Sequence, residues 1–436
     1  QAATGASSGA FSSQSANGVI YRSGGTKLVG GTASSYGATF AADDVIRVQL
    51  NLDAATKTIE FFKNDSSQGT INLNDNVTYF PAQFSADAGL VTVADFGQSG
   101  FSAAAGFNLL NTSNLATPTI SDGSKYFQAT LYSGNGSTQS INQSGNRTFQ
   151  PDFVWIKNRS ATDGHVLTDA VRGVTKILAS DATTIETTDA DTLTAFESDG
   201  FALGDDDKVN TSSENFVAWQ WLAGNSSGST NDDGSVDSTV TVNTTAGFSI
   251  CKFNPGGNSN VTFGHGLGVA PRLVLVKNLE DATNWQVLHL DQGVGNKLFL
   301  NTNATTASDA NMWQNTAPTS TVVSVGTAQT SNEQNIAYCF AEVEGFSKFG
   351  SYTGNGNANG PFVYTGFAPS FIIFKNISVS YNWDMRDNKR DPLNPNTFYL
   401  SPSQIGDAEV TTSDAVDFLS NGFKWRSSGA TNNGSG

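Results

Sequence analysis

The sequence Phe153-Val154-Trp155-Ile156-Lys157-Asn158 occurs in three related copies along this chain. The other two copies are Leu273-Val274-Leu275-Val276-Lys277-Asn278 and Phe371-Ile372-Ile373-Phe374-Lys375-Asn376. In each copy four apolar residues precede a Lys-Asn pair. A continuous apolar run of this length, rich in aromatic and β-branched residues, indicates a strand that is covered on both faces. We therefore expect three interior strands, with the three lysines at one structural position.

The residues around each copy repeat as well, so one β unit is predicted three times. A proline lies just upstream of every copy, where a strand entrance tolerates it. Opening strands rich in aromatic residues, each followed by a Gly-rich turn, are expected at 126–132, 248–253 and 346–352. The predicted boundaries are 121–224 for repeat 1, 245–349 for repeat 2 and 350–436 for repeat 3, with linkers at 101–120 and 225–244.

The end of each repeat gives further signals. The dipeptides Asp199-Gly200 and Asn421-Gly422 predict two β-hairpins, because both residue pairs favour tight hairpin turns. Closing strands are expected at 216–221 in repeat 1 and at 336–341 in repeat 2. Repeat 3 has no such strand before Gly436, so its sheet is expected to lack a strand and the natural chain is expected to continue.

Residues 1–100 are predicted to form a separate β-domain. Apolar and polar residues alternate from Val45 to Leu52, as in a half-buried strand, and a second strand follows at 58–64 after a turn. Further strands are expected at 79–82 and 90–93. The domain boundary is placed before the Gly-, Asn- and Thr-containing linker at 101–120.

Composition and charge exclude several classes of partner. The chain has 436 residues and a net charge of −16, with 23 basic residues against 39 acidic ones. Nucleic-acid binding and attachment to an anionic membrane both need a basic surface, so neither is expected. No apolar run approaches the length of a membrane-spanning helix, and residues 1–17 do not resemble a signal peptide. Cys251 and Cys339 are expected to be buried thiols, and a bond between them stays possible.

The first domain resembles a known family. The segments Leu50-Asn51-Leu52-Asp53, Ile59-Glu60-Phe61-Phe62-Lys63-Asn64 and Asp95-Phe96-Gly97-Gln98 are similar to the second half of a SPRY domain. That resemblance implies a concanavalin-like β-sandwich over about 85 residues. The first half of such a domain is not recognisable here, and the natural chain is therefore expected to begin upstream of Gln1.

The three repeats resemble a β-domain found in virion proteins of tailed bacteriophages. The resemblance rests on the segments 153–160, 336–345 with 349–356, and Arg390-Asp391-Pro392. In that family a SPRY-like domain often comes immediately before the repeats. The resemblance implies a virion component, with other virion proteins as partners, more firmly than it implies any chemistry.

Few residues suggest catalysis or metal binding. The three histidines lack metal-ligand spacing, and no P-loop or zinc motif is present. Asn231-Asp232-Asp233-Gly234 looks like part of a calcium loop, but an ordinary turn is the favoured interpretation. Glycoside hydrolysis needs two carboxylates at a defined separation, and nothing in the sequence pairs the candidates Glu197, Glu214, Glu342, Glu344 and Asp387. No cofactor, metal site or catalytic residue is predicted.

A binding surface is easier to propose. The position eight residues after each central lysine is always a ring: His165, Trp285 or Trp383. If the rings are exposed, Trp285 and Trp383 can stack on a host glycan, with Asp387 and Arg390 orienting its hydroxyl groups. Trp383→Ala would then leave the melting temperature nearly unchanged and weaken adsorption to host cells. The favoured alternative is that the ring fills the core of each repeat.

Taken together, these features predict an all-β protein made of serial β-sandwich (concanavalin- or jelly-roll-like) domains, one partial and three repeated. The expected function is that of a structural and adhesive component of a tailed-phage virion, most simply a tail fibre or spike that is extracellular on the mature particle. A capsid-attached fibre or decoration protein and a polysaccharide depolymerase are the two alternatives. A homo-oligomer is expected, with a trimer as the first guess, and a host-surface glycan or protein is the expected receptor.

Overall fold

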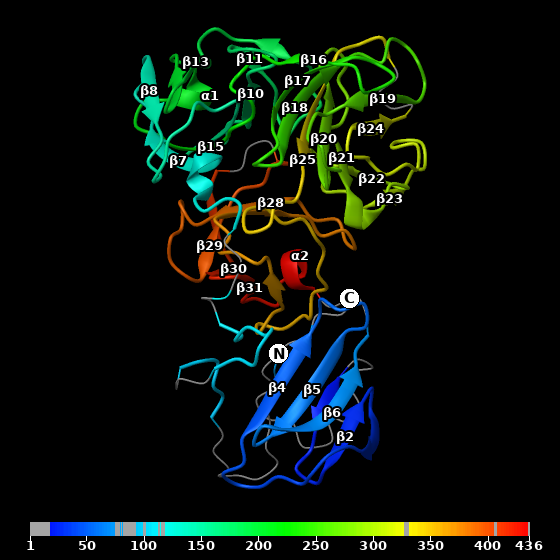
Figure 1. Ribbon diagram of the computed structural model, residues 1–436. Helices are drawn as coiled ribbons and strands as arrows, with labels where there is room; N and C mark the ends of the chain where they lie inside the picture. The colour runs from blue at the N-terminus through cyan, green and yellow to red at the C-terminus, as the bar shows by residue number, and fades with distance from the viewer. Residues whose placement is uncertain are drawn as a thin grey trace. The chain divides into compact units, whose positions relative to one another are not determined.

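The computed structural model describes residues 18–74, 79, 81, 93–98, 102–111, 114, 118–326, 331–404 and 408–434. Strands make up almost all of its regular structure, which confirms the predicted all-β class (Figure 1). The chain divides into two compact units, residues 1–116 and 117–436. Among the described residues, no helix has the length and apolar character needed to cross a membrane.

The described part of residues 1–116 contains two three-stranded antiparallel sheets. Their strands are β1 (Val19–Tyr21), β2 (Thr26–Val29), β3 (Thr32–Ser35), β4 (Ile46–Asn51), β5 (Thr58–Lys63) and β6 (Ser66–Asn72). β4 and β5 form the predicted hairpin, and Phe61 of β5 packs in a small core with Tyr21 and Ile71. The strands predicted at 79–82 and 90–93 lie mostly outside the described residues.

Repeat 1 contains a four-stranded sheet with the order β10-β9-β15-β7. These strands are β7 (Phe127–Ser133), β9 (Phe153–Asn158), β10 (Val166–Asp169) and β15 (Asn215–Trp221). β9 is therefore an interior strand, as predicted, and all of its residues are buried. The predicted hairpin also forms. The remaining elements are η2 (Gly123–Lys125), β8 (Gln139–Asn142), β11 (Lys176–Ile177), β12 (Thr187–Thr188), β13 (Leu193–Glu197), β14 (Gly200–Leu203) and α1 (Asp207–Asn210).

Repeat 2 contains a longer sheet with the order β16-β17-β18-β25-β20-β21-β22-β23. Its strands are β16 (Ser229–Asn231), β17 (Ser238–Asn243), β18 (Phe248–Phe253), β20 (Leu273–Asn278), β21 (Gln286–His289), β22 (Asn296–Phe299), β23 (Ala307–Ser308) and β25 (Asn335–Phe340). β19 (Val261–Gly264) pairs separately with β24 (Val322–Val325), and η3 (Leu290–Gln292) follows β21. The predicted linker at 225–244 is wrong, because β16 and β17 form a hairpin there that extends this sheet.

Repeat 3 has a shorter central sheet than the other repeats. In the part of the chain that the structure describes, β27 (Phe371–Phe374) pairs only with β28 (Asp384–Asp387), so it is not the interior strand that was expected. The expected opening strand at 346–352 is also absent, because its counterparts β7 and β18 pair with closing strands that repeat 3 lacks. The other elements are β26 (Phe362–Tyr364), β29 (Asn396–Tyr399), β30 (Val410–Leu419), β31 (Gly422–Trp425) and α2 (Ala430–Asn433).

The central strand of each repeat packs against two different cores. In β9, Val154 and Ile156 face a core within repeat 1, whereas Phe153 and Trp155 face a core that all three repeats share. β20 and β27 alternate in the same way. This double coverage explains why the runs are apolar throughout. The repeats follow one another along the chain, but in space they pack around one common core.

The Lys-Asn pair closes the turn after each central strand. The side-chain oxygen of Asn158 accepts hydrogen bonds from the backbone N–H groups of Ser160 and Ala161, at 2.9 and 3.1 Å. Asn278 and Asn376 make the equivalent pairs of bonds. Each lysine ammonium donates to the carbonyl oxygen of the asparagine that follows it. The three lysines therefore make equivalent turn contacts. The expected interior strand is present at Lys157 and Lys277, but Lys375 follows the edge strand β27, so that part of the prediction is wrong for repeat 3.

Candidate functional site

The four residues proposed to bind a glycan are all buried. Trp285 lies just before β21 and is 0% exposed, and Trp383 lies just before β28 and is 6% exposed. Asp387 ends β28, Arg390 lies in the turn that follows, and both are also buried. The hypothesis of an exposed stacking surface is therefore wrong for these residues. The rings fill the interior, as the alternative interpretation proposed.

Each ring binds a backbone carbonyl of a neighbouring repeat. Trp285 Nε1 of repeat 2 donates to the carbonyl oxygen of Ala179 in repeat 1, at 2.7 Å. Trp383 Nε1 of repeat 3 donates to that of Phe299 in repeat 2, at 2.8 Å. These two acceptors occupy equivalent positions in their repeats. Ala179 follows Leu178, which pairs with Leu167 of β10, and Phe299 follows Leu298, which pairs with Val287 of β21.

His165 completes the set. Its Nε2 lies 3.0 Å from the carbonyl oxygen of Ser401 in repeat 3. Trp155 Nε1 donates to His165 Nδ1 at 2.8 Å, so Nδ1 is an acceptor and Nε2 carries the proton. Repeat 2 thus binds repeat 1, repeat 3 binds repeat 2 and repeat 1 binds repeat 3. The three repeats form a closed ring, with approximate threefold symmetry in these contacts.

A second set of contacts joins aromatic side chains of the closing strands to aspartates of neighbouring repeats. The Tyr338 hydroxyl in β25 donates to Asp169 at 2.7 Å, and Trp219 Nε1 in β15 donates to Asp387 at 3.1 Å. Asp169 and Asp387 are equivalent positions, twelve residues after Lys157 and Lys375. These bonds run between repeats in the same cyclic order as the ring contacts.

Asp387 and Arg390 form a buried ion pair. Arg390 Nε lies 2.6 Å from Asp387 Oδ2, and the backbone N–H of Arg390 donates to Asp387 Oδ1 at 2.8 Å. Repeat 1 contains the same arrangement in Asp169 and Arg172. Burial alone would lower the pKa of Arg390, but the charges of Asp387 and Glu409 outweigh that effect and raise it. Arg390 is therefore held in its charged form.

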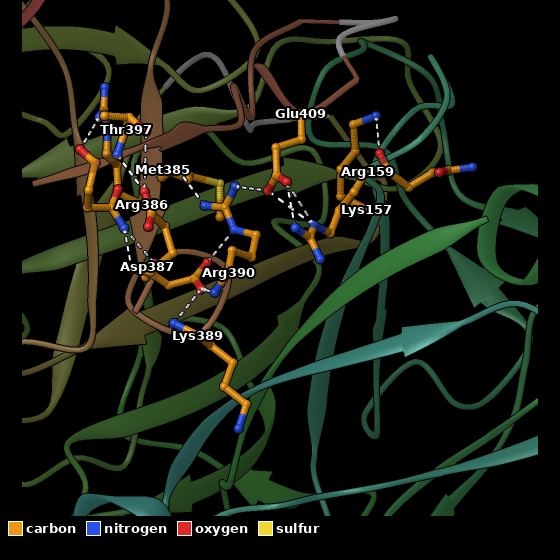
Figure 2. A network of polar contacts seen from close by, with 12 residues as sticks. Lys157, Arg159, Met385, Arg386, Asp387, Lys389, Arg390, Thr397 and Glu409 are labelled. Carbon is orange, nitrogen blue, oxygen red and sulfur yellow. Dashed lines mark hydrogen bonds and ion pairs between the residues drawn. The ribbon is translucent and has the colours of Figure 1, made fainter. Parts of the chain in front are cut away.

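Glu409 links this ion pair to repeat 1, as Figure 2 shows. Arg390 Nη1 lies 3.0 Å from one of its carboxylate oxygens, and Arg159 Nη2 lies 2.6 Å from the other. The backbone N–H of Glu409 also donates to the carbonyl oxygen of Arg159, at 3.0 Å. A nearly solvent-free carboxylate between two guanidinium groups fixes the relative position of repeats 1 and 3.

The sequence did not single out Glu409 or Arg159. Glu186 is the counterpart of Glu409 in repeat 1: its carboxylate lies 3.4 Å from Arg172 Nη1, and its backbone N–H donates to the carbonyl oxygen of Leu279 in repeat 2 at 2.9 Å. The spacing from arginine to glutamate is 186 − 172 = 14 residues in repeat 1 and 409 − 390 = 19 residues in repeat 3. Because the spacing differs, counting residues from the central lysine could not find this contact.

Burial controls the protonation of His165 and of its neighbour Asp181. Desolvation, reinforced by the charge of Lys157, lowers the pKa of His165 to about 3, so the ring stays neutral at physiological pH. Asp181 Oδ2 accepts a hydrogen bond from the backbone N–H of His165 at 3.2 Å. Its second oxygen, Oδ1, is buried and has no partner among the described residues. Desolvation raises the pKa of Asp181 to about 6.

Asp181→Asn is expected to change how stability depends on pH. A carboxyl group whose pKa is higher in the folded state than in the unfolded state destabilises the fold as pH rises from about 4 to about 6. The asparagine variant lacks this titration, so its stability relative to the parent should increase across that window by up to roughly 3 kcal/mol. Urea unfolding at several pH values measures the difference, and the exposed Asp232→Asn is the control. A difference that does not vary with pH would contradict the assignment.

The other polar groups considered for chemistry have structural contacts. Glu197 accepts from Ser140, Glu214 from Asn158 and Glu342 from Lys348. Cys251 and Cys339 are buried free thiols. In the part of the chain that the structure describes, no cluster of three or more His, Cys, Asp or Glu residues could hold a metal ion.

Comparison with known proteins gives one result. Residues 122–436 match a family described as a domain of unknown function, DUF7483. Neither the curated proteins nor the solved structures contain a match. The matched segment is more than half of the chain and spans all three repeats with the core they share. The chain therefore belongs to the DUF7483 family.

Proposed function

We propose that this protein is a structural component of a tailed-phage virion appendage, with a role in contact with the host surface. The closed ring of contacts between the three repeats carries the proposal. Residues at each repeated position are used to bind a neighbouring repeat, as Trp285, Trp383 and His165 illustrate. The resemblance of the repeats to phage virion β-domains supplies the setting.

A closed ring suits a load-bearing part. Each repeat buries the inner face of its central strand against the other two, so no repeat can leave without exposing apolar surface from all three. The ion pair between Arg159 of repeat 1 and Glu409 of repeat 3 adds a directional contact, and Arg390 of repeat 3 holds the same carboxylate. A body of this kind holds its outward loops in fixed positions, which is what an appendage requires of its domains.

Within this proposal, the surface that meets the host is a polar hollow in repeat 2. It has a volume of about 720 Å³ and lies beside the β16–β17 hairpin. Its lining includes the charged residues Asp237 and Lys252 and the amides Asn254 and Gln334. Charged and amide groups of this kind orient sugar hydroxyls. The hollow replaces the buried tryptophans as the candidate glycan site.

The proposed location can be tested by labelling virions. An antibody against the recombinant chain should bind purified particles of the phage that encodes it, and electron microscopy should place the label on the tail. Label on the capsid would favour the decoration-protein alternative. Absence of the chain from purified particles would contradict the proposal.

The proposed host contact is tested by competition. Soluble protein should slow phage adsorption to host cells, and Asp237→Ala should reduce this competition without changing the melting temperature. Trp383→Ala is not a suitable variant, because the ring is buried. If Asp237→Ala competes as well as the parent protein, the hollow is not the host-binding site. The proposed structural role of the protein in the virion would not be affected.

A homo-oligomer, with a trimer as the first choice, is part of the same proposal. Exposed aromatic residues are available for an interface, including Phe362 and Tyr364 of β26. Mass measurement of the intact recombinant chain checks this expectation. A clean monomer at micromolar concentration would contradict it.

A further inference from the structure

The central sheet of repeat 3 contains an unfilled strand position. In repeats 1 and 2, the central strands β9 and β20 pair on one edge with β10 and β21, and on the other with the closing strands β15 and β25. Among the described residues of repeat 3, β27 pairs with β28 alone. Its second edge therefore presents backbone groups that its two counterparts use in antiparallel ladders.

Repeat 3 also contains a counterpart of the contact that anchors β7, the outer neighbour of the closing strand in repeat 1. In repeat 1, β7 pairs with the outer edge of β15, and the Tyr132 hydroxyl donates to the carbonyl oxygen of Val209 at 2.8 Å. In repeat 3, the equivalent Tyr352 donates to that of Asn432 at 2.7 Å. Tyr352 thus keeps the contact that anchors the outer strand in repeat 1, although the segment 346–352 is not a strand and has no ladder partner among the described residues.

The side chains of β27 show the same incompleteness. All residues of β9 are buried, and β20 is buried except at Leu273. Every residue of β27, from Phe371 to Phe374, is only partly buried. Partly exposed apolar side chains on a free strand edge are a surface that a further strand would cover.

His289 marks where one side chain of that strand would lie. Tyr338 and Trp219 of the closing strands donate to Asp169 and Asp387 of the neighbouring repeats. His289 is the third equivalent position, twelve residues after Lys277. Its Nδ1 is buried and has no partner among the described residues. The cyclic order of the contacts requires the missing donor to come from repeat 3.

The helix α2 shows how a strand would enter. In repeat 1, β15 begins 215 − 210 = 5 residues after the last residue of α1. Asn210 at the end of α1 accepts from the backbone N–H of Asn135 at 2.9 Å. Asn433 at the end of α2 accepts from that of Asn355 at 2.7 Å. The two helices are therefore anchored alike, and a strand that followed α2 by the path from α1 to β15 would reach the free edge of β27.

We propose that the free edge of β27 is an acceptor site for an antiparallel β-strand that enters from α2, in the register of β15 and β25. The strand has apolar residues on both faces and carries a tryptophan or tyrosine whose N–H or O–H reaches His289 Nδ1. It completes the third side of the ring. This inference is independent of the proposed function, because it rests on the repeats alone.

The test adds such a strand to the full chain. The sequence of residues 214–222, which contains β15, is appended directly after Gly436, because Gly436 corresponds to Ser213 in the repeat 1 register. Hydrogen exchange of residues 371–374 should slow by about tenfold or more, and the melting temperature should rise. A version with phenylalanine in place of the copied Trp219 should still exchange more slowly than the parent chain. Its exchange should be about fivefold faster than that of the tryptophan version, which is the effect of losing one hydrogen bond.

Two controls decide the outcome. A version with proline at alternate positions cannot form the ladder and should behave like the parent chain. If the first and proline versions show the same exchange, the edge is not a strand acceptor. If the parent chain already protects residues 371–374 and sediments as a dimer, a second copy occupies the edge and the assignment to a strand from α2 is overturned.

Discussion

Replacing Trp285 by alanine is expected to lower the free energy of unfolding by about 3–5 kcal/mol, the usual cost of deleting a large aromatic side chain from a packed core. The ring is fully buried in the core shared by the three repeats and stacks near Tyr338. The substitution also leaves the Ala179 carbonyl without its donor. Urea unfolding followed by tryptophan fluorescence measures the change, since all 7 tryptophans lie within residues 117–436.

Two variants separate the contributions in this experiment. Trp285→Phe keeps most of the apolar volume and loses the hydrogen bond, so a smaller loss of roughly 1–3 kcal/mol is expected. Tyr364→Ala removes a ring that is 64% exposed and should change stability by no more than about 0.5 kcal/mol. A Trp285→Ala variant as stable as the Tyr364→Ala variant would show that the ring is not part of a core.

Replacing Asp387 by alanine should cost about 3–5 kcal/mol, because it leaves the buried Arg390 guanidinium without its nearest counter-charge. Both side chains are almost fully removed from solvent, and Asp387 also accepts the bond from Trp219 of repeat 1. Glu409 remains beside Arg390, so part of the charge stays compensated. Chemical denaturation of the variant and the parent chain gives the difference.

An exposed ion pair provides the matched control. Glu342 and Lys348 are 2.6 Å apart, and about a third or more of each side chain is exposed. Glu342→Ala should therefore cost between about 0 and 1 kcal/mol. If Asp387→Ala costs no more than Glu342→Ala, the buried Asp387–Arg390 pair does not stabilise the fold as proposed.

The sequence was informative wherever the structure depends on local pattern. The strands at the three apolar runs and the hairpins at Gly200 and Gly422 were predicted, because strand burial and turn chemistry leave signals within a few residues. The lack of a closing strand among the described residues of repeat 3 was also predicted. That absence explains in turn why β27 has a free edge and why 346–352 is not a strand.

Contacts between repeats left weaker signals. A ring eight residues after each central lysine suggested an exposed binding surface at Trp285 and Trp383, but each ring crosses to a carbonyl in another repeat. Periodicity within one strand cannot distinguish solvent from a neighbouring repeat. Recurrence of the ring in all three units was the useful signal, since a shared packing role explains it better than three separate sites. The hairpin in 225–244 was missed because Ser, Thr, Asn and Gly dominate that segment.

The central claim is that the three repeats form one closed ring around a shared core, and hydrogen exchange tests it most directly. Exchange in β9, β20 and β27 is measured for the parent chain and for Trp383→Ala, in mild denaturant where exchange occurs through unfolding. If the repeats unfold together, the substitution in repeat 3 should speed exchange in all three strands by the same factor. Faster exchange in β27 alone, with β9 and β20 unchanged, would contradict the closed ring.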